Sequence, residues 1–512
     1  MHDQKILIID YGSQYTQLIA RRIRENNTYC EVINPQSINK KNYYNNAIGV
    51  ILSGGPSSVI NDNSYDLPDI LFSKNIPVLG ICFGMQLLCK KFNSKVKESA
   101  SREYGKASLK IKKNVKIFKG IEKSLEVWMS HGDSVTTKPD NFSIIASTNK
   151  KSISAIKEND KEIYGFQFHP EVTHTLDDGK IIYNFVKNIC KSKGSWTTKN
   201  IINNQISDIK KIVKKDNVIL GLSGGVDSSV AAAIIHKAIK KQLTCIFIDN
   251  GLLRLDEKEQ VEIGFKDFKN IKIIYVDASK LFLRRLKNIT DPEEKRKVIG
   301  KAFIDVFQKE AKKIKNVKWL AQGTIYPDVI ESAASSESAH LIKSHHNVGG
   351  LPKNMKLKLL EPLRELFKDE VRKIGVGLGI EKKLINRHPF PGPGLAVRIL
   401  GEVKNEYADT LRQADHIFIS MLHKRKLYNQ ISQAFTVFMP VKSVGVTGDG
   451  RSYGNVVSLR AVQTIDFMTA KPFNFPFDFL EEVSTKIIND VPGISRVCLD
   501  ISSKPPATIE WE

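Results

Sequence analysis

Twice in this chain a short apolar run ends at a glycine-rich turn and passes directly into an amphipathic segment. The first case is PVLGICFGMQLL at residues 77–88, and the second is NVILGLSGGVDSSVAAAII at residues 217–235. A bounded apolar run is typical of a buried strand, and the helical spacing that follows is typical of a helix packed on a sheet. Because this alternation continues to about residue 380, it predicts doubly wound parallel sheets of the α/β class.

The length of 512 residues is too great for one hydrophobic core. A polar stretch at 190–200 contains Gly and Ser and predicts a boundary, and the Pro- and Gly-rich segment 387–399 predicts a rigid connector. We therefore expect two doubly wound parallel-sheet domains, at 1–195 and 196–386. A smaller α+β domain at 387–512 is expected to follow them.

Composition argues for a globular protein that is not built for a membrane. The hydrophobic content is 41% and the charged content 26%, no apolar run reaches membrane-spanning length, and no signal peptide opens the chain. The six cysteines are scattered without metal-ligand spacing, which predicts a reducing, cytoplasmic location and no disulfide framework. The net charge of +23 is spread along the sequence, so we expect neither a nucleic-acid nor a membrane partner.

Cys82 lies between Gly80 and Gly84 at the first strand-to-helix turn. This G-x-C-x-G pattern is that of a nucleophile elbow with sulfur in place of the serine oxygen. A helix N-terminus favours a thiolate, which is the reactive form of cysteine. A buried structural cysteine is the alternative explanation.

A general base and an orienting acid are expected in EIYGFQFHPEV, residues 162–172. The alternation of Phe and polar residues predicts a half-buried strand with His169 at its polar end, and Glu171 returns to the same face. His169 can then take the Cys82 proton while Glu171 holds the imidazole tautomer. The backbone N–H of Phe83 and the Gly-Gly turn of ILSGGPSS are the expected oxyanion donors.

These segments resemble the class I glutamine amidotransferase domain, which hydrolyses glutamine to glutamate and ammonia. The resemblance runs from ILIIDYGSQYTQLIARRIRE at 6–25 through WMSHGD to FQFHPEVTHT. It implies that Cys82, His169 and Glu171 react and that Gly55 and Phe83 frame the oxyanion. It also implies that Gln86 and a turn formed by Ser130, His131, Gly132 and Asp133 hold the glutamine. Related sequences often carry tyrosine at the position of Phe83, but a backbone donor does not depend on that side chain.

The second turn is not a Walker A loop, because it has no G-x-x-x-x-G-K-[ST] pattern. It presents glycine N–H groups, hydroxyls and a helix N-terminus to an anion. It resembles the PP-loop of ATP pyrophosphatases, which cleave ATP to AMP and pyrophosphate. The resemblance implies ATP binding with Mg²⁺ near Asp227, by the run Ser223, Gly224, Gly225, Val226, Asp227, Ser228 and Ser229. The next strand ends at 249–251, where a nucleotide lies in an open α/β sheet.

Further segments make nearly the whole chain similar to the glutamine-hydrolysing GMP synthetases, notably GTIYPDVIES, KSHHN, RHPFPGPGLAVR, GVTGDGR and KPPATIEWE. The resemblance implies amination of xanthosine 5′-phosphate (XMP) to GMP in guanine nucleotide synthesis. Ammonia comes from glutamine, and ATP is cleaved through an adenylated XMP intermediate. A homodimer through the third domain is implied as well. The implied substrate-binding residues are Arg296, Asp328, Glu331, Gln433, Lys504, Thr508 and Glu510.

No zinc and no organic cofactor are expected, because the adjacent His345 and His346 lack a third ligand at metal spacing. Two other functions remain open. Glutamine-dependent NAD synthetase also uses a PP-loop, but its glutaminase is normally of an unrelated type without G-x-C-x-G and His-Pro-Glu. A basic tRNA-modifying PP-loop protein would fit the net charge, but it does not need a glutaminase triad.

Overall fold

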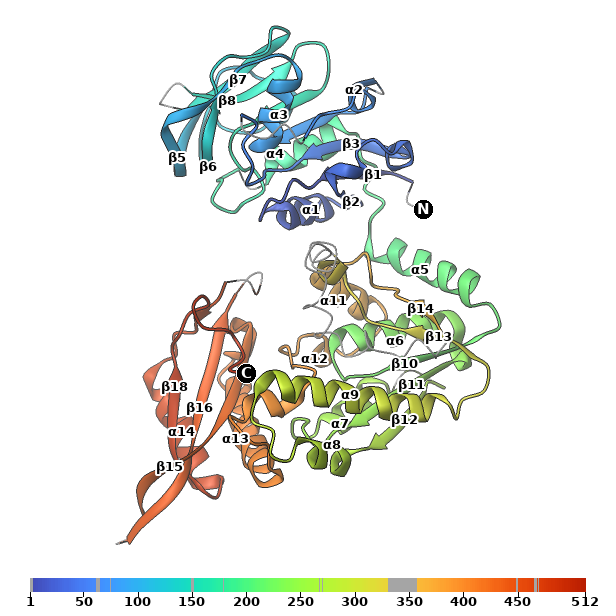
Figure 1. The fold of residues 1–512 in the computed structure, drawn as a ribbon, viewed down its shortest axis with the longest axis vertical. Helices are drawn as coiled ribbons and strands as arrows, with labels where there is room; N and C mark the ends of the chain where they lie inside the picture. Colours follow the sequence, from blue (N-terminus) through green and yellow to red (C-terminus); the bar gives the residue numbers. More distant parts are fainter. Residues whose placement is uncertain are drawn as a thin grey trace. The chain divides into compact units, whose positions relative to one another are not determined.

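The computed structural model describes residues 3–60, 65–73, 75–148, 152–177, 179–266, 268, 270–329, 357–447, 450–464, 467 and 469–512, with the side chains of 99–102 and 447 left out. The chain divides into two compact units, Met1–Ile201 and Ile202–Glu512. Figure 1 shows the elements of both units, coloured along the sequence. Each unit is described by itself.

The first unit is built on a nine-stranded sheet with the order β2-β1-β3-β4-β9-β8-β7-β5-β6. Its strands are β1 (Lys5–Ile9), β2 (Cys30–Ile33), β3 (Ala47–Leu52), β4 (Val78–Ile81), β5 (Val96–Ile111), β6 (Ser124–Val135), β7 (Phe142–Thr148), β8 (Ile153–Glu158) and β9 (Ile163–Phe166). Its α-helices are α1 (Thr16–Glu25), α2 (Ile70–Ser73), α3 (Phe83–Lys91) and α4 (Lys180–Tyr183).

This sheet is parallel only in part. The strands from β2 to β9 in that order pair in parallel, whereas β8, β7, β5 and β6 are added by antiparallel pairing. The expected α/β fold class with a parallel sheet is confirmed, and the structure adds an antiparallel half that was not expected. The antiparallel half arises because consecutive strands there are joined without the long crossover that parallel pairing needs.

The parallel half is the buried centre of this unit. All residues of β4 are buried, and so are all but one residue of β1. A core cluster joins these strands to the apolar face of α3 through Leu7, Val50, Val78, Met85 and Leu88. Strands that are covered on both faces consist of continuous apolar runs. This explains why the strands of the parallel half could be predicted from the sequence.

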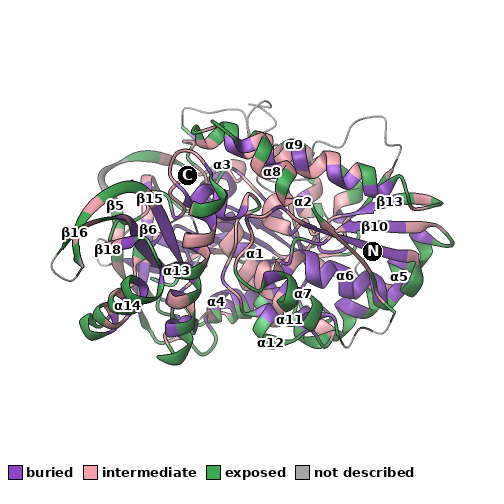
Figure 2. Ribbon diagram, turned by 90° about the horizontal axis from the view of Figure 1, so that it is seen from below, coloured by how far each residue is buried: buried purple, intermediate pink, exposed green. Residues whose placement is uncertain are grey.

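The second unit contains a fully parallel sheet with the order β12-β11-β10-β13-β14. Its strands are β10 (Asn217–Gly221), β11 (Leu243–Asp249), β12 (Lys272–Asp277), β13 (Val317–Ala321) and β14 (Lys358–Leu360). The helices are α5 (Thr198–Val213), which crosses the boundary between the units, α6 (Val226–Ile239), α7 (Glu257–Gly264), α8 (Ser279–Leu286), α9 (Pro292–Ala311), α11 (Lys368–Gly377) and α12 (Lys382–Ile385). Figure 2 shows β10 and much of α6 as buried.

A third, mainly antiparallel sheet follows in the same unit. It consists of β15 (Gln433–Thr447), β16 (Gly450–Gln463), β17 (Lys471–Pro472) and β18 (Ile494–Asp500), and β18 pairs with β16 in parallel. The helices α13 (Asn405–Lys424) and α14 (Phe477–Asp490) accompany it. The helix, the alternating strands and the fold class expected for this segment are confirmed.

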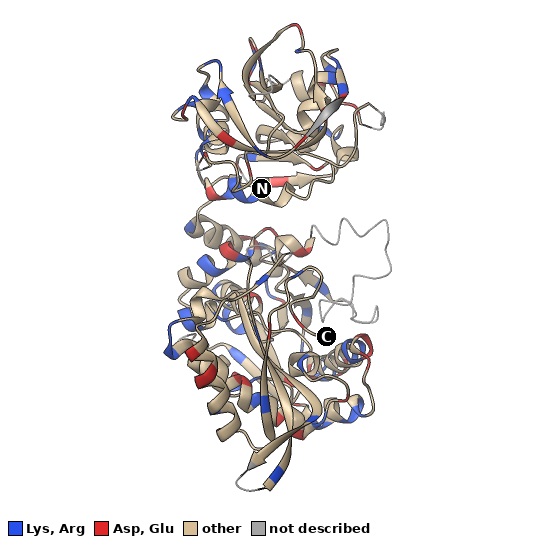
Figure 3. Ribbon diagram, turned by 90° about the vertical axis from the view of Figure 1, so that its left-hand side faces the viewer, with Lys and Arg blue, Asp and Glu red and all other residues tan. Residues whose placement is uncertain are grey.

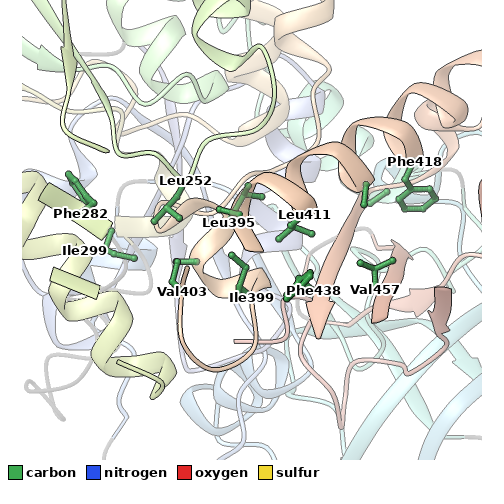
Figure 4. Packing of buried hydrophobic residues seen from close by; sticks show 14 of the residues in the cluster. Leu252, Phe282, Ile299, Leu395, Ile399, Val403, Leu411, Phe418, Phe438 and Val457 are labelled. Carbon is green, nitrogen blue, oxygen red and sulfur yellow. The ribbon is translucent and has the colours of Figure 1, made fainter. Parts of the chain in front are cut away.

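The second and third sheets share one hydrophobic core. It runs from Phe282 and Ile299 through Leu395 and Ile399 to Phe438 and Val457 (Figure 4). The connector 387–399 therefore enters the core, where residues Gly394–Arg398 form the 3₁₀-helix η7. The division into domains at 196–386 and 387–512 stays a prediction, because the two segments form one compact unit.

Basic side chains are distributed over the surfaces of both units. Figure 3 shows Lys and Arg on many separate elements, interspersed with Asp and Glu. Within the described part of the chain, no helix is both long enough and apolar enough to cross a membrane.

Candidate active sites

The backbone at Cys82 is held in a conformation that a non-glycine residue rarely adopts. Cys82 has φ 50° and ψ −105°, between the end of β4 and the start of α3. A Cβ placed on Gly80 would come within 2.6 Å of the Gly84 backbone, and one on Gly84 would collide with Leu52. Both flanking positions therefore require glycine, which explains the G-x-C-x-G pattern.

Cys82, His169 and Glu171 are brought together by different elements. The His169 Nδ1 lies 2.7 Å from Glu171 Oε1, and both side chains are almost completely buried. Burial opposes the charged imidazole, but the Glu171 carboxylate and a hydrogen bond with Cys82 outweigh it and raise the pKa of His169 to about 10. The group that receives the Cys82 proton can therefore retain it at neutral pH.

The segment that carries His169 differs from the expectation in one respect. Strand β9 ends at Phe166, and residues 163–172 are all buried rather than half-buried. The polar side chains face inward because they have partners there: Gln167 Nε2 lies 3.8 Å from Cys82 Sγ, and Thr175 Oγ1 donates to His169 O at 2.6 Å. Alternation along a strand cannot distinguish a water-facing side from a buried, hydrogen-bonded side.

A cavity of about 830 Å³ opens in front of Cys82. Nine of the residues predicted for the glutaminase reaction line it, namely Gly55, Cys82, Phe83, Gln86, Ser130, His131, Gly132, Asp133 and His169. Glu171 does not line the cavity and lies behind His169. The Phe83 N–H belongs to the first turn of α3, where an N–H has no intrahelical acceptor.

The residues Ser130 to Asp133 lie within strand β6, so the expectation of a turn is wrong. Their strand pairs with β5, where Ser130 faces Tyr104 and Asp133 faces Glu98. The Gln86 Nε2 donates to Asp133 O at 3.0 Å, which joins α3 to this strand. The apolar residues Leu125, Val127 and Met129 occur at every second position just before this segment, and this period of two is the sequence signal that could have shown a strand.

Several cavity residues were not found from the sequence. Gly12, Ser13, Gln14 and Tyr15 line the cavity from the loop after β1, and Tyr104 lines it from β5. The His131 Nδ1 donates to Asp133 O at 2.9 Å, and burial lowers the pKa of His131. No recognisable motif surrounds Tyr104, which reaches the site only through strand pairing.

The second site is the loop between β10 and α6. Gly224 has φ +73°, and Gly225 caps α6. The Ser223 and Ser228 hydroxyl oxygens lie 3.0 Å apart, and the Gly225 N–H donates to Ser223 Oγ at 3.3 Å. The loop therefore places hydroxyls and a helix N-terminus together, an arrangement that suits a phosphate.

Asp227 and Ser229 begin α6 and have unsatisfied oxygens. Among the described residues, Asp227 Oδ1 and Ser229 Oγ are buried and have no hydrogen-bond partner. The other Asp227 oxygen accepts from Lys368 Nζ at 2.5 Å. A carboxylate oxygen is a ligand that Mg²⁺ prefers, and one or two carboxylates with substrate phosphates usually suffice. The loop thus fits a magnesium–nucleotide complex.

Lys368 and Arg387 were missed as residues of this site. Lys368 opens α11, far from the loop in sequence. Arg387 Nη1 donates to Gly224 O at 2.7 Å, and its Nη2 donates to Glu257 Oε1 at 2.7 Å. Lys368 belongs to a charged segment whose pattern indicates only a solvated helix. Arg387 belongs to a Pro-rich segment whose pattern indicates only a connector.

The residues that are predicted to bind the acceptor substrate form separate groups of contacts in the structure. Gln433 Nε2 donates to Glu510 Oε1 at 2.7 Å, and Arg398 binds both oxygens of the same carboxylate at 2.8 and 3.0 Å. The Thr508 hydroxyl donates to the Glu510 backbone oxygen. Arg398 is fully buried and was not found from the sequence.

Other acceptor candidates lie beside the C-terminus. Arg296 and Lys295 of α9 contact Glu512, and Figure 1 shows the C-terminus next to this helix. The Lys504 Nζ instead donates to Phe467 O at 2.8 Å. Asp328 Oδ2 accepts from the Ile325 N–H at 2.9 Å. Glu331, His345 and His346 lie outside the described residues.

Comparison with known protein families gives three matches along the chain. Residues 7–189 match "Glutamine amidotransferase class-I", residues 199–275 match "NAD synthase", and residues 420–511 match "GMP synthase C terminal domain". The NAD synthase match covers the PP-loop and the first three strands of the second sheet. The match at residues 420–511 is the one that distinguishes among PP-loop proteins.

Relatives match over the full length. A GMP synthase (glutamine-hydrolyzing) of Photobacterium profundum is 58% identical and covers 100% of this chain and 99% of its own. One of Vibrio vulnificus is 57% identical with the same coverage. Among solved structures, a glutamine amidotransferase from Thermotoga maritima is 19% identical, covers 47% of this chain and 93% of its own, and has a TM-score of 0.30.

Proposed function

The chain belongs to the family of glutamine-hydrolysing GMP synthases, and from this premise we propose which of its residues carry the two half-reactions. As a member of that family it is a ligase that aminates XMP to GMP with ammonia from glutamine and consumes ATP. The alternatives, an NAD synthetase and a tRNA-modifying enzyme, are not supported by full-length relatives of this kind.

In the first half-reaction, Cys82 attacks the amide carbon of glutamine in the cavity of the first unit. His169 receives the thiol proton and donates it to the departing ammonia, and Glu171 holds Nδ1 so that Nε2 faces the sulfur. Water then hydrolyses the Cys82 thioester, which releases glutamate and restores the thiol. The Phe83 N–H and the backbone at Gly55 stabilise the oxyanion. Gln86, Ser130, Gly132 and Asp133 hold the glutamine. The burial of the His169–Glu171 pair behind the cavity supports this assignment.

In the second half-reaction, residues Ser223 to Ser229 bind the phosphates of ATP. The xanthine 2-oxygen bonds to the α-phosphorus, pyrophosphate leaves, and ammonia then attacks C2 and releases AMP. Asp227 and the phosphates would hold Mg²⁺, which supplies positive charge that stabilises the departing pyrophosphate. The two unsatisfied buried oxygens of Asp227 and Ser229 support this assignment. Lys368 pairs with the other Asp227 oxygen and adds a positive charge beside the loop.

The acceptor nucleotide is assigned to the third segment and the tail. Lys504 and Thr508 are proposed to contact XMP together with Arg296, Gln433, Asp328 and Glu331. Glu510 is proposed for the same site, and its carboxylate also accepts hydrogen bonds from Arg398 and Gln433. It holds the tail against η7 and β15, so that Lys504 is presented from an anchored segment.

We also propose a homodimer formed through residues 387–512. Strands β15 and β16 extend beyond the core as a hairpin whose outer part carries exposed Val444, Val446 and Tyr453. Val444 pairs with Tyr453 across the two strands, and Val446 lies on the same face. An exposed apolar strip of this kind is typical of a subunit interface. The use of ATP and glutamine supports a cytoplasmic location.

One observation carries the proposal. A strained Cys82 elbow with a buried His–Glu pair and a PP-loop with one unsatisfied oxygen each on Asp227 and Ser229 occur in one chain. The Cys82 site supplies ammonia. The PP-loop site adenylates an oxygen of the acceptor, and ammonia then displaces that oxygen as AMP.

The test is product analysis with purified protein. Incubation with glutamine, ATP, Mg²⁺ and XMP is expected to give glutamate, GMP, AMP and pyrophosphate in equal amounts. Formation of ADP and phosphate would contradict adenylation. Turnover of nicotinic acid adenine dinucleotide in place of XMP would restore the NAD synthetase alternative.

A further inference from the structure

The carbonyl of the PP-loop is held by an arginine from the connector. Arg387 Nη1 donates to Gly224 O at 2.7 Å, and Nη2 donates to Glu257 Oε1 at 2.7 Å. The Arg387 side chain is 10% exposed and the Glu257 side chain 1% exposed. Two charge-assisted hydrogen bonds from one planar guanidinium fix both direction and distance.

This contact determines which way the loop peptide faces. The C=O of Gly224 and the N–H of Gly225 belong to one peptide plane and point in opposite directions. With the carbonyl on the Arg387 side, the Gly225 N–H is directed to the side of Ser223, where it donates to Ser223 Oγ at 3.3 Å. Ser223 in turn contacts Ser228. The hydroxyls and the N–H are thus gathered on the face opposite Arg387.

Because Gly224 is a glycine, the orientation of the Gly224–Gly225 peptide depends on a contact from outside the loop. Gly224 has φ +73°, and a glycine can adopt several backbone conformations at similar free energy. A Cβ at Gly224 would lie 3.1 Å from Val261, 3.3 Å from Glu257 and 3.6 Å from Arg387. The loop therefore lies directly against the Arg387–Glu257 pair.

Glu257 is itself anchored to the third segment. Its Oε2 accepts from the Arg254 N–H at 3.1 Å. The Arg254 side chain forms an ion pair with Asp415 of α13 at 3.1 Å and donates to Ala434 O of β15 at 3.3 Å. Asp415 also accepts from the Thr436 N–H at 2.9 Å. These contacts connect the loop with the start of β15, which carries Gln433.

We propose that Arg387 and Glu257 are positioning residues that hold the PP-loop in its phosphate-binding orientation. Arg387 acts through the Gly224 carbonyl, and Glu257 keeps the guanidinium directed at that carbonyl. The inference rests on the proposed function of the loop. Two of the five N–H donors of Arg387 are held by the loop backbone and by a buried carboxylate, and this is the geometry of a positioning residue.

The experiment uses the full-length protein with ammonium chloride as the nitrogen source, so that the glutaminase does not contribute. The variants are Arg387→Met, Arg387→Lys, Glu257→Gln and the double variant Arg387→Met/Glu257→Gln. Arg285→Met is the matched control, because it removes an arginine–carboxylate contact of 2.6 Å between α8 and α9 in the same unit. KM for ATP, KM for XMP and kcat are measured, together with the thermal unfolding midpoint.

We expect Arg387→Met and Glu257→Gln each to raise the KM for ATP by about 10- to 100-fold, the range for loss of a charge-assisted hydrogen bond. The double variant is expected to be no worse than Arg387→Met, because both residues act through one contact. Arg387→Lys should recover part of the effect, and the control should match the wild type. KM for XMP should change less than KM for ATP.

Three results would overturn the inference. An unchanged KM for ATP in Arg387→Met would show that the pair only stabilises the fold. An effect of Arg387→Met with none of Glu257→Gln would make Arg387 a direct phosphate ligand. If the rise in the KM for ATP in the double variant equalled the product of the two single rises, the residues would act independently.

Binding of α,β-methylene-ATP by calorimetry provides a readout that does not need the reaction. The dissociation constant is expected to rise in the same variants by the same factor as the KM for ATP. If the wild type bound this analogue but made no GMP, the proposed function would fail while the positioning role could still be judged. If Arg387→Met did not fold, Glu257→Gln and Arg387→Lys would carry the same comparison, and an unchanged dissociation constant in both would overturn the inference.

Discussion

At the scale of single residues, the proposed glutaminase site combines a cysteine held at φ 50° with a histidine whose pKa is raised by one carboxylate. A conformation of that kind is unfavourable by about 1–3 kcal/mol for a residue with a side chain. It persists because Gly80 and Gly84 leave space for the turn, and because the Cys82 N–H donates to Phe166 O at 2.6 Å. The strain places the sulfur at the cavity instead of in the core.

Glu171→Gln tests the carboxylate. The variant should lose at least about 100-fold in glutamine-driven synthesis, in the range of general acid–base contributions. Synthesis from ammonium chloride should remain, because the second unit does not use Glu171. Steady-state rates with the two nitrogen sources give the comparison. Equal loss with both sources would show that Glu171 only supports the fold.

The same variant should alter the pH dependence of stability. The folded pKa of His169 is raised to about 10 from an ordinary value of 6.5, so its ion pair stabilises the native state fully below pH 6.5. This contribution disappears as pH rises through about 10. Breaking a buried pair destabilises by about 3–5 kcal/mol. Urea unfolding should therefore show the largest difference between wild type and Glu171→Gln below pH 6.5, and a difference that grows toward pH 10 would contradict the assignment.

At the scale of elements, patterns confined to one segment could be predicted and contacts between segments could not. The elbow, the PP-loop, α9 and α13 follow from apolar spacing and glycine position. Tyr104, Lys368 and Arg387 reach their sites through strand pairing or tertiary packing, which leaves no local signal. The turn at Ser130–Asp133 is implied by the family resemblance alone, and the strand that the structure has there depends on pairing with β5, which a local pattern does not show.

The tail gives a prediction at this scale. Lys504→Ala should raise the KM for XMP by about 10- to 150-fold, which corresponds to one charge-assisted hydrogen bond to phosphate. The KM for ATP should change little. Lys486→Ala is the control, since Lys486 pairs with Asp490 inside α14. An equal rise of both Michaelis constants, or no rise for XMP, would remove Lys504 from the acceptor site.

At the scale of the whole molecule, the sequence separated the glutaminase from the synthetase but did not show how the third segment is built in. The composition of 387–399 predicts a connector, whereas Leu395 and Ile399 are completely buried in a core shared by two sheets. Pro and Gly content indicates that a regular element is interrupted, but it does not indicate whether the segment is exposed. Residues 202–512 accordingly form one compact unit.

The proposed dimer is tested on the β15–β16 hairpin. Val446→Glu combined with Tyr453→Glu places charge on side chains that are 78% and 66% exposed. Light scattering after size-exclusion chromatography should show the mass of a dimer for the wild type and of a monomer for this variant. Ile212→Glu, at an exposed apolar residue of α5, should leave the mass unchanged. A monomeric wild type, or a dimer that survives both substitutions, would exclude this face.

The central claim is that one chain holds two separate reactions that meet only through ammonia, and Cys82→Ala tests it most directly. GMP formation is measured with glutamine and, in parallel, with ammonium chloride at raised pH, using the same ATP and XMP concentrations. We predict that synthesis from glutamine falls to background and that synthesis from ammonia remains within about twofold of the wild type, because Ser223 to Ser229 lie in the other unit. Loss of both activities in a folded variant, or retention of both, would contradict the account.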